Sequence, residues 1–297
     1  MVNIQETNTI RSIRRWAINA LNKSDIEDPD INAEVLLSHV LSCDRLKLHT
    51  NPENIIKDKD VIKYKELIKK RARHVPLQYI TGHVEFMSLD FIVDKSVLIP
   101  RPETEILVET ALKKVKNGVF PNNTITIVDI GTGSGNIAIS LAVNLQNVQV
   151  YASDISKDAL DIARINARRH DVAEKIRFLH GYLFEAFDGH LEKGSINLIV
   201  SNPPYVSESG LNNLEPEIKE HEPYEALIAG KDGLCFYKQI IKSASDWLKP
   251  KGCIILEAGE TQAKAIIELI GKEGYFEDIE IIKDLQGKER IVSAKRK

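Results

Sequence analysis

Two short stretches of this sequence combine residue types that could hold a ligand and act on a small polar group. The first is Asp129-Ile-Gly-Thr-Gly-Ser-Gly135, which lies between an apolar, strand-like segment and a helix-like segment. Its glycines allow a tight turn and let a ligand approach the backbone closely. The second is Ser201-Asn-Pro-Pro-Tyr205, which follows the apolar segment INLIV. The first stretch predicts a binding loop, and the second predicts a place where chemistry occurs.

The glycine loop favours one class of ligand. A dinucleotide-binding loop needs a third glycine at position 136, where this chain has Asn136, and no lysine follows as in a phosphate-binding P-loop. Asp129 would repel a pyrophosphate but would favour a ligand with a sulfonium or ammonium cation. These local features favour S-adenosylmethionine over NAD. The expected cofactor contacts are Asp129, Gly131, Thr132, Gly133, Ser134 and Gly135.

Asp154 ends the next apolar segment, VQVYASD. A carboxylate at such a strand end can accept hydrogen bonds from ribose hydroxyls. Taken alone, it could equally be a loop aspartate that caps the helix expected to start near Ser156. With the glycine loop at this distance, we expect Asp154 to bind the ribose and the adjacent Ile155 to belong to the same site.

The Asn-Pro-Pro-Tyr turn offers hydrogen-bond acceptors in a stiff frame. Two prolines stop the sheet and carry no N–H, so backbone carbonyls can point at a ligand without internal competition. The side chain of Asn202 offers one more carbonyl. Two such acceptors, with Tyr205 packing on a flat group, would hold a planar –NH2. A strand-ending turn with a packing tyrosine is the simpler alternative, but the glycine loop at this spacing favours a site.

Alternating strand and helix patterns must position these residues. From residue 125 onward, apolar strand-like runs alternate with helical runs, which is typical of a parallel sheet covered by helices on both faces. Ligands bind such sheets at the carboxyl ends of the strands. The expected strands are 125–130, 148–154, 176–180, 195–200, 252–259, 275–283 and 289–295, and the expected helices are 136–145, 156–169, 236–248 and 261–271.

The first 82 residues have helical periodicity, with Asp28 and Pro29 expected at the start of the second helix. A basic helix over 57–73 is interpreted as a solvated face, with a partner-binding patch as the alternative. Residues 83–99 predict a hairpin with a turn near Asp94–Lys95. Pro100-Arg-Pro-Glu-Thr-Glu105 predicts a stiff turn followed by a helix from Glu103. The expected domains are 1–82 (helical), 83–100 (linking hairpin) and 101–297 (the strand–helix domain that carries both motifs).

Composition excludes several classes of protein. The chain has 297 residues, 43% hydrophobic and 28% charged, which suggests about two globular domains. A net charge of −3 argues against a generic nucleic-acid clamp. No apolar run is long enough to span a membrane, and the start does not read as a signal peptide. Three dispersed cysteines and histidines without ligand spacing predict no metal site and a reducing, cytoplasmic setting.

The two motifs together resemble those of a known family. DIGTGSG followed by SNPPY resembles the class I S-adenosylmethionine-dependent methyltransferases that act on exocyclic or amide nitrogen. QYITGHVEFMSLDF and LIPRPETE further resemble the peptide chain release factor glutamine methyltransferases of the HemK/PrmC family. The resemblance implies a doubly wound, mostly parallel, seven-stranded Rossmann-like α/β sheet, a small N-terminal helical bundle and a linking β-hairpin.

The resemblance also implies a reaction. The methyl group of S-adenosylmethionine would pass to N5 of the glutamine in the GGQ loop of bacterial class 1 release factors, modulating translation termination. Gly131 to Gly135 and Asp154 would hold the cofactor; Asn202, Pro203, Pro204 and Tyr205 would hold the glutamine. Tyr182 departs from the family, which commonly has an acidic residue there, and Leu183 would supply an apolar wall. The N-terminal helices would contact the release factor, with no direct nucleic-acid binding.

Other functions stay open from the residues alone. A DNA or RNA exocyclic-amine methyltransferase would use the same turn on an extruded base, and the basic helix is its best support. A non-catalytic cofactor sensor would not need the Asn-Pro-Pro-Tyr turn, and a dehydrogenase is disfavoured by Asn136. The charged segment 207–230 suits either a lid over the substrate or a plain surface loop.

Overall fold

The computed structural model describes residues 8–117 and 124–297. The chain forms two compact units. The first consists of Met1–Gly82 together with Glu215–His221, and the second of His83–Leu214 together with Glu222–Lys297. A short piece of the second half of the sequence therefore belongs to the N-terminal unit.

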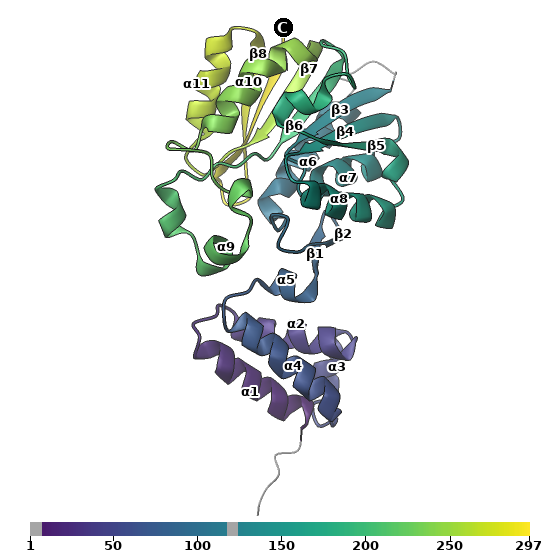
Figure 1. The fold of residues 1–297 in the computed structure, drawn as a ribbon, viewed down its shortest axis with the longest axis vertical. Helices are drawn as coiled ribbons and strands as arrows, with labels where there is room; N and C mark the ends of the chain where they lie inside the picture. The colour runs from purple at the N-terminus through teal and green to yellow at the C-terminus, as the bar shows by residue number, and fades with distance from the viewer. Residues whose placement is uncertain (1–7, 118–123) are drawn as a thin grey trace, which may run out of the picture. The chain divides into compact units, whose positions relative to one another are not determined.

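The N-terminal unit is built from helices (Figure 1). Buried side chains at helical spacing, such as Ile13, Ala17 and Leu21, form its apolar core, and the hydroxyl of buried Tyr64 donates to the carbonyl of Ala33 at 2.9 Å. The short helices α3 and α5 had no clear periodic signal. The helices are α1 (Ile10–Asn22), α2 (Pro29–Leu41), α3 (Arg45–Thr50), α4 (Asp58–Arg71), α5 (Leu77–Thr81) and α9 (Pro216–His221).

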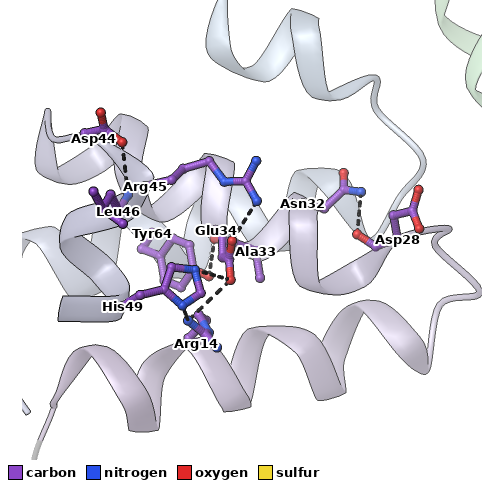
Figure 2. Close-up of polar contacts among 10 residues, drawn as sticks. All are labelled: Arg14, Asp28, Asn32, Ala33, Glu34, Asp44, Arg45, Leu46, His49 and Tyr64. Carbon is purple, nitrogen blue, oxygen red and sulfur yellow. Dashed lines mark hydrogen bonds and ion pairs between the residues drawn. The ribbon is translucent and has the colours of Figure 1, made fainter. Parts of the chain in front are cut away.

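Asp28 and Pro29 stand at the start of the second helix as predicted, with Asp28 in the N-cap position, but the Asp28 side chain does not cap the helix. Asp28 has left-handed backbone angles (φ 45°, ψ 55°), whereas a capping side chain normally comes from an extended residue. The side-chain amide of Asn32 donates instead to the carbonyl of Glu27 at 2.9 Å. It also donates to the carbonyl of Asp28 at 3.0 Å (Figure 2).

The linking hairpin is present, but its turn lies elsewhere. Strands β1 (His83–Phe86) and β2 (Leu89–Ile92) pair antiparallel around Met87 and Ser88. Both turn residues have positive φ, 52° and 59°, as a two-residue hairpin turn requires, although neither is the usual Gly or Asn. Asp94 forms a separate turn in which its carboxylate accepts the N–H of Ser96 at 2.9 Å.

A seven-stranded sheet forms the second unit, as the sequence predicted. Its strand order is β5-β4-β3-β6-β7-β9-β8, parallel as far as β7 and antiparallel over β9 and β8. The strands are β3 (Ile125–Ile130), β4 (Val148–Asp154), β5 (Ile176–His180), β6 (Ile196–Ser201), β7 (Leu248–Glu257), β8 (Phe276–Lys283) and β9 (Glu289–Arg296).

Helices cover both faces of this sheet (Figure 1). On one face, apolar side chains of α6 (Pro102–Lys116), α7 (Asn136–Asn144) and the hairpin join one core cluster. On the other face, α10 (Cys235–Trp247) and α11 (Ala263–Glu273) form a second cluster. Helix α8 (Lys157–Arg169) lies beside α7 and contacts β4 and β5. Within the described ranges, no helix is both long and apolar enough to cross a membrane.

Candidate active site

The two motifs meet where the strand order reverses. Strand β3 pairs with β4 on one side and with β6 on the other, so the segments after β3 and β6 leave the same edge of the sheet. The hydroxyl of Ser201 donates to the carbonyl of Ile130 at 2.7 Å and ties the two strand ends together. Ligands of doubly wound sheets bind at this reversal point. The sequence prediction that both motifs share one edge is confirmed.

A cavity opens between the motifs. It is lined by the glycine-loop residues 131–134, by Asn202, and by Pro100, Arg101 and Thr104 of the stiff turn and the helix after it. The other predicted site residues in the described chain lie outside this lining: Asp129, Gly135, Asp154, Ile155, Leu183, Pro203, Pro204 and Tyr205. Asn202 and the glycine loop therefore share one space.

The glycine loop has two open positions and one packed position. A Cβ added at Gly131 (φ +73°) or Gly133 (φ +54°) would meet no atom within 4 Å. A Cβ at Gly135 would lie 2.8 Å from Cδ1 of Ile139, so this glycine lets the loop pack on α7. The backbone at 131 and 133 is thus accessible to a ligand, while Gly135 has a structural role.

The side chains of Thr132 and Ser134 face inward. Both residues are almost fully buried. The Thr132 hydroxyl donates to Oδ2 of Asp129 at 2.7 Å, and the Ser134 carbonyl accepts from the side-chain amide of Asn166 at 2.9 Å. The same Asn166 amide holds the backbone of Ile92 through two hydrogen bonds, 2.8 and 3.0 Å long. Asn166 thus fastens the loop to the hairpin, a role that its position within a helical run did not reveal.

Asp129 lies beneath the loop rather than at its surface. Its side chain is fully buried, and Oδ1 has no hydrogen-bond partner among the described residues. Burial raises the pKa of Asp129 to about 7, against the lowering effect of the Thr132 hydroxyl. A buried acceptor without a partner disfavours an anion above it and suits a ligand that carries positive charge.

Asp154 connects the end of β4 to the loop. Its Oδ2 accepts the N–H of Gly133 at 2.8 Å, and its Oδ1 accepts the N–H of Ser156 at 2.9 Å. Burial raises the pKa of Asp154, although these backbone donors lower it. Ser156, not Asp154, accepts the first-turn N–H of Ala159 and caps α8, as predicted for Ser156. Each carboxylate oxygen keeps a lone pair for another donor.

Apolar and aromatic groups lie near these strand ends. Ile155 is unusually exposed for its type, at 57%. Leu183 is half-buried and packs against the core on the α10 face. The Tyr182 hydroxyl donates to Oε1 of Gln239 at 3.0 Å, and its ring lies beside Phe236. Tyr182 is therefore held against α10 by a hydrogen bond and a ring contact.

The Asn202 amide has a defined orientation. Its Nδ2 donates to the hydroxyl of Thr104 at 3.2 Å, and its amide lies near enough to the end of β7 to lower the pKa of Glu257. Within the described ranges, no donor is bonded to its Oδ1. The side chain thus uses its N–H groups internally and keeps its carbonyl free. Pro203 is buried, and Pro204 is half-buried.

Tyr205 lies among charged groups. Its backbone carbonyl accepts from Nε2 of Gln262 at 2.9 Å, and its half-buried ring packs beside Gly259. Burial and the charge of Glu257 raise the pKa of Tyr205 to about 12, while Arg101 and Arg290 act in the opposite direction. Arg101 itself pairs with the buried carboxylate of Glu222.

Glu257 is a site residue that the sequence analysis missed. It ends β7, is only 3% exposed, and adjoins the Asn202 turn because Leu256 pairs with Ser201. Burial raises its pKa to about 7, against hydrogen bonds from Thr104 and Asn202. Its Oε2 has no hydrogen-bond partner in the described structure. An acidic residue that ends an apolar strand is the same signal that identified Asp154.

The charged segment 207–230 has local structure. The backbone of Val206 bonds to Leu227 and Ala229, which closes the segment at its base. Within it, Glu217 of α9 pairs with Arg71, and both residues belong to the N-terminal unit. In the described part of the chain, no cluster of three or more acidic, His or Cys residues could hold a metal ion.

Comparisons with known proteins agree with the fold and the motifs. Residues 12–82 match the family model described as the PrmC N-terminal domain, and residues 121–288 match a methyltransferase domain. The release factor glutamine methyltransferase of Clostridium botulinum is 40% identical over 276 residues, covering 93% of this chain and 95% of that protein. The release factor glutamine methyltransferase of Nitratidesulfovibrio vulgaris is 37% identical over 289 residues, covering 97% of this chain and 95% of that protein.

A solved structure shares the fold at low identity. The hMettl16 catalytic domain, in complex with the MAT2A 3'UTR hairpin 6, aligns with a TM-score of 0.53 and 15% identity. The match covers 83% of this chain and 84% of that one. At this identity the similarity concerns the sheet and its helices, and it says nothing of the substrate.

Proposed function

Because the chain belongs to the release factor glutamine methyltransferase family, we propose that it methylates the side-chain amide nitrogen, N5, of a glutamine in a peptide chain release factor. Its methyl donor is S-adenosylmethionine. The substrate is the glutamine of the GGQ loop in bacterial class 1 release factors, and the modification tunes translation termination in the cytoplasm. The observation that carries this proposal is the Asn202 carbonyl, held free beside the glycine-loop cavity.

The cofactor site fits this donor. The open backbone at Gly131 and Gly133, the remaining lone pairs of Asp154 and the exposed Ile155 offer polar and apolar contacts. The buried, unpartnered oxygen of Asp129 suits a cationic ligand rather than a pyrophosphate. Leu183 adds apolar surface near the same edge. When bound, S-adenosylmethionine supplies an electrophilic methyl group on a sulfonium.

The Asn202 turn solves the problem that an amide nitrogen is a poor nucleophile. Its lone pair is delocalised into the carbonyl, so it must be freed and aimed. The side-chain carbonyl of Asn202 and the backbone carbonyl of Pro203 accept the two N–H groups of the glutamine and stabilise the positive charge that develops on nitrogen. Pro204 keeps the turn stiff, and the ring of Tyr205 packs against the flat amide group of the substrate. Loss of one such contact costs about a hundredfold in rate.

Proton removal needs no dedicated base before attack. The nitrogen becomes acidic only once it carries the new methyl group, so its proton can pass to water afterwards. Orienting the two reactants is the larger contribution, on the order of 7–11 kcal/mol of the barrier. The protein's role is therefore to place and polarise the amide.

The test compares Asn202→Ala with a matched control, Asn147→Ala. Asn147 is exposed and precedes β4, so it lies at the opposite edge of the sheet. With purified release factor and radiolabelled donor, Asn202→Ala should lower kcat about a hundredfold, while Asn147→Ala should match the wild type. Mass spectrometry should find one methyl group on the glutamine. Normal turnover in Asn202→Ala would refute the proposed site.

A nucleic-acid substrate is the competing possibility, because the same turn could hold the –NH2 of a base. The net charge of −3 and the family membership favour the protein substrate. Offering release factor, DNA and RNA in parallel decides between them. Label in a nucleic acid and none in the release factor would overturn the assignment.

A further inference from the structure

Asn202 can serve the reaction in only one of its two amide orientations. With Oδ1 toward the substrate it accepts an N–H of the glutamine; turned by half a rotation, it would present donors to a group that itself needs acceptors. Its orientation is therefore a functional requirement. The proline residues beside it restrain the backbone but do not restrain this side-chain rotation.

The neighbours of Asn202 select the productive orientation. Thr104, in the first turn of α6, accepts from Nδ2 at 3.2 Å. Glu257, at the end of β7, adjoins this pair because Leu256 pairs with Ser201, and the Thr104 hydroxyl and the Asn202 amide both lower its pKa. A carboxylate can only accept, so it draws the amide N–H and the threonine hydroxyl hydrogen toward itself. The three side chains form a closed set that leaves the Asn202 carbonyl as the free group.

We propose that Glu257 is a positioning residue which, together with Thr104, holds Asn202 with its carbonyl toward the substrate nitrogen. The inference rests on the function proposed above and deepens it. Glu257 acts through Asn202 and exchanges no proton with the substrate. Its burial is unfavourable for a charged group, and one of its oxygens lacks a partner, so packing alone does not explain its presence.

Protonation of Glu257 would release this restraint. Burial raises its pKa to about 7; Glu103 acts in the same direction and Arg290 opposes it. The other ionisable groups that interact with it are the phenols of Tyr205 and Tyr237, which stay neutral near that pH. A protonated carboxyl can donate to Oδ1 of Asn202, which permits the turned amide. The orientation of Asn202 should therefore depend on pH near neutrality.

The first experiment separates positioning from folding and cofactor binding. Glu257→Gln keeps the shape but gains donors, so kcat should fall about a hundredfold while the Kd for S-adenosylhomocysteine, measured by calorimetry, changes less than twofold. Glu257→Asp keeps an acceptor and should recover at least a tenth of the wild-type rate. Glu109→Gln, exposed on α6, is the matched control and should leave kcat unchanged.

A second pair tests the threonine. Thr104→Val keeps the shape but lacks the hydroxyl and should lower kcat about tenfold. Thr104→Ser restores the hydroxyl and should recover most of that loss. Equal rates for the valine and serine variants would mean that the hydroxyl has no part in positioning.

The third readout observes Asn202 directly. The side-chain 15N–1H signals of Asn202, assigned from their absence in Asn202→Ala, should shift with pH in the wild type with a midpoint near that of Glu257, about 7. In Glu257→Gln they should not titrate. If wild-type enzyme methylates the release factor but Glu257→Gln has a kcat within twofold of it, positioning is refuted and the proposed function stands. If wild-type enzyme methylates no release factor, the function itself fails.

Discussion

Two buried glutamates, one in each unit, have contrasting surroundings: one lies among ion-pair partners and the other, within the described part of the chain, does not. Glu34 of α2 meets two arginines and a histidine: Arg14 at 3.3 Å, Arg45 at 2.7 Å and His49 at 3.1 Å (Figure 2). Glu257 of β7 has no ion-pair partner in the described structure; the Asn202 amide and the Thr104 hydroxyl lower its pKa, and one of its oxygens has no hydrogen-bond partner. Both side chains are under 10% exposed. They therefore differ in their partners rather than in their burial.

The two environments move the pKa in opposite directions. Burial alone would raise the pKa of Glu34, but hydrogen bonds from Arg45 and His49, with the charges of His49 and Arg14, lower it. Burial of Glu257 is not offset in this way, and its pKa rises to about 7. The first glutamate joins α1, α2 and α3 and stabilises the unit. The second remains unfavourable as a charge, which is typical of a group retained for function.

The largest stability effect is expected for Glu257→Gln, and it is a gain. A carboxyl whose folded pKa lies above its unfolded value destabilises the fold where it is charged, most strongly above pH 7. The shift from 4.5 to about 7 corresponds to about 3 kcal/mol. Urea unfolding at pH 8 should show Glu257→Gln more stable than wild type by about 1–3 kcal/mol, because the amide also has a burial cost.

The pH dependence supplies the control for that gain. In the wild type, the destabilisation caused by charged Glu257 disappears as pH falls from 7 toward 4.5. The reason is that Glu257 takes up its proton at a higher pH in the folded protein than in the unfolded chain. The difference between Glu257→Gln and wild type should therefore shrink over that range. A variant that is less stable than wild type at pH 8 would show that the charge of Glu257 is well compensated, and the contrast with Glu34 would disappear.

Glu34→Gln should have the opposite effect, of somewhat smaller size. Removing the negative charge leaves Arg14, Arg45 and His49 without their common partner, and we expect a loss of about 2 kcal/mol at pH 7. A carboxyl with a lowered folded pKa stabilises above its unfolded value of 4.5, and this contribution is lost as pH falls through the folded pKa. The loss in Glu34→Gln should therefore vanish in acid.

Activity provides the second comparison for this variant. At a temperature where both proteins are folded, Glu34→Gln should retain wild-type kcat, whereas Glu257→Gln should not. A large fall in kcat for Glu34→Gln, without unfolding, would show that the ion cluster serves catalysis as well as stability.

The parts that the sequence predicted well depend on local patterns. Apolar runs that end in Asp129 or at Ser201 specify buried parallel strands, and the rule that ligands bind at strand ends brings the glycine loop and Asn202 together. The capping role of Ser156 is equally local. The hairpin turn was misplaced because Met87 and Ser88 have backbone angles that are unusual for their residue types, and the same is true of Asp28, whose side chain does not cap α2 although its position at the helix start was predicted.

The missed site residues depend on contacts between distant parts of the chain. Thr104, Asn202 and Glu257 come from three elements, and only the pairing of β6 with β7 and the packing of α6 bring them together. The sequence predicted that Asn202 would offer a carbonyl. It could not show which groups orient that carbonyl, because Thr104 and Glu257 are far from Asn202 in the sequence and come near it only in the folded chain.

The smallest effect is expected for His49→Gln, which removes one of the three partners of Glu34. The ring Nε2 lies 3.1 Å from Oε1 of Glu34, but about half of the His49 side chain is exposed, so water can replace it. Arg14 and Arg45 remain. We expect a loss of about 1 kcal/mol, roughly half that of Glu34→Gln. Urea unfolding of the single and double variants measures how far the two effects overlap. If His49→Gln alone loses as much free energy of unfolding as Glu34→Gln, then a single hydrogen bond stabilises Glu34. The contrast with Glu257 would then come from one donor rather than from several partners.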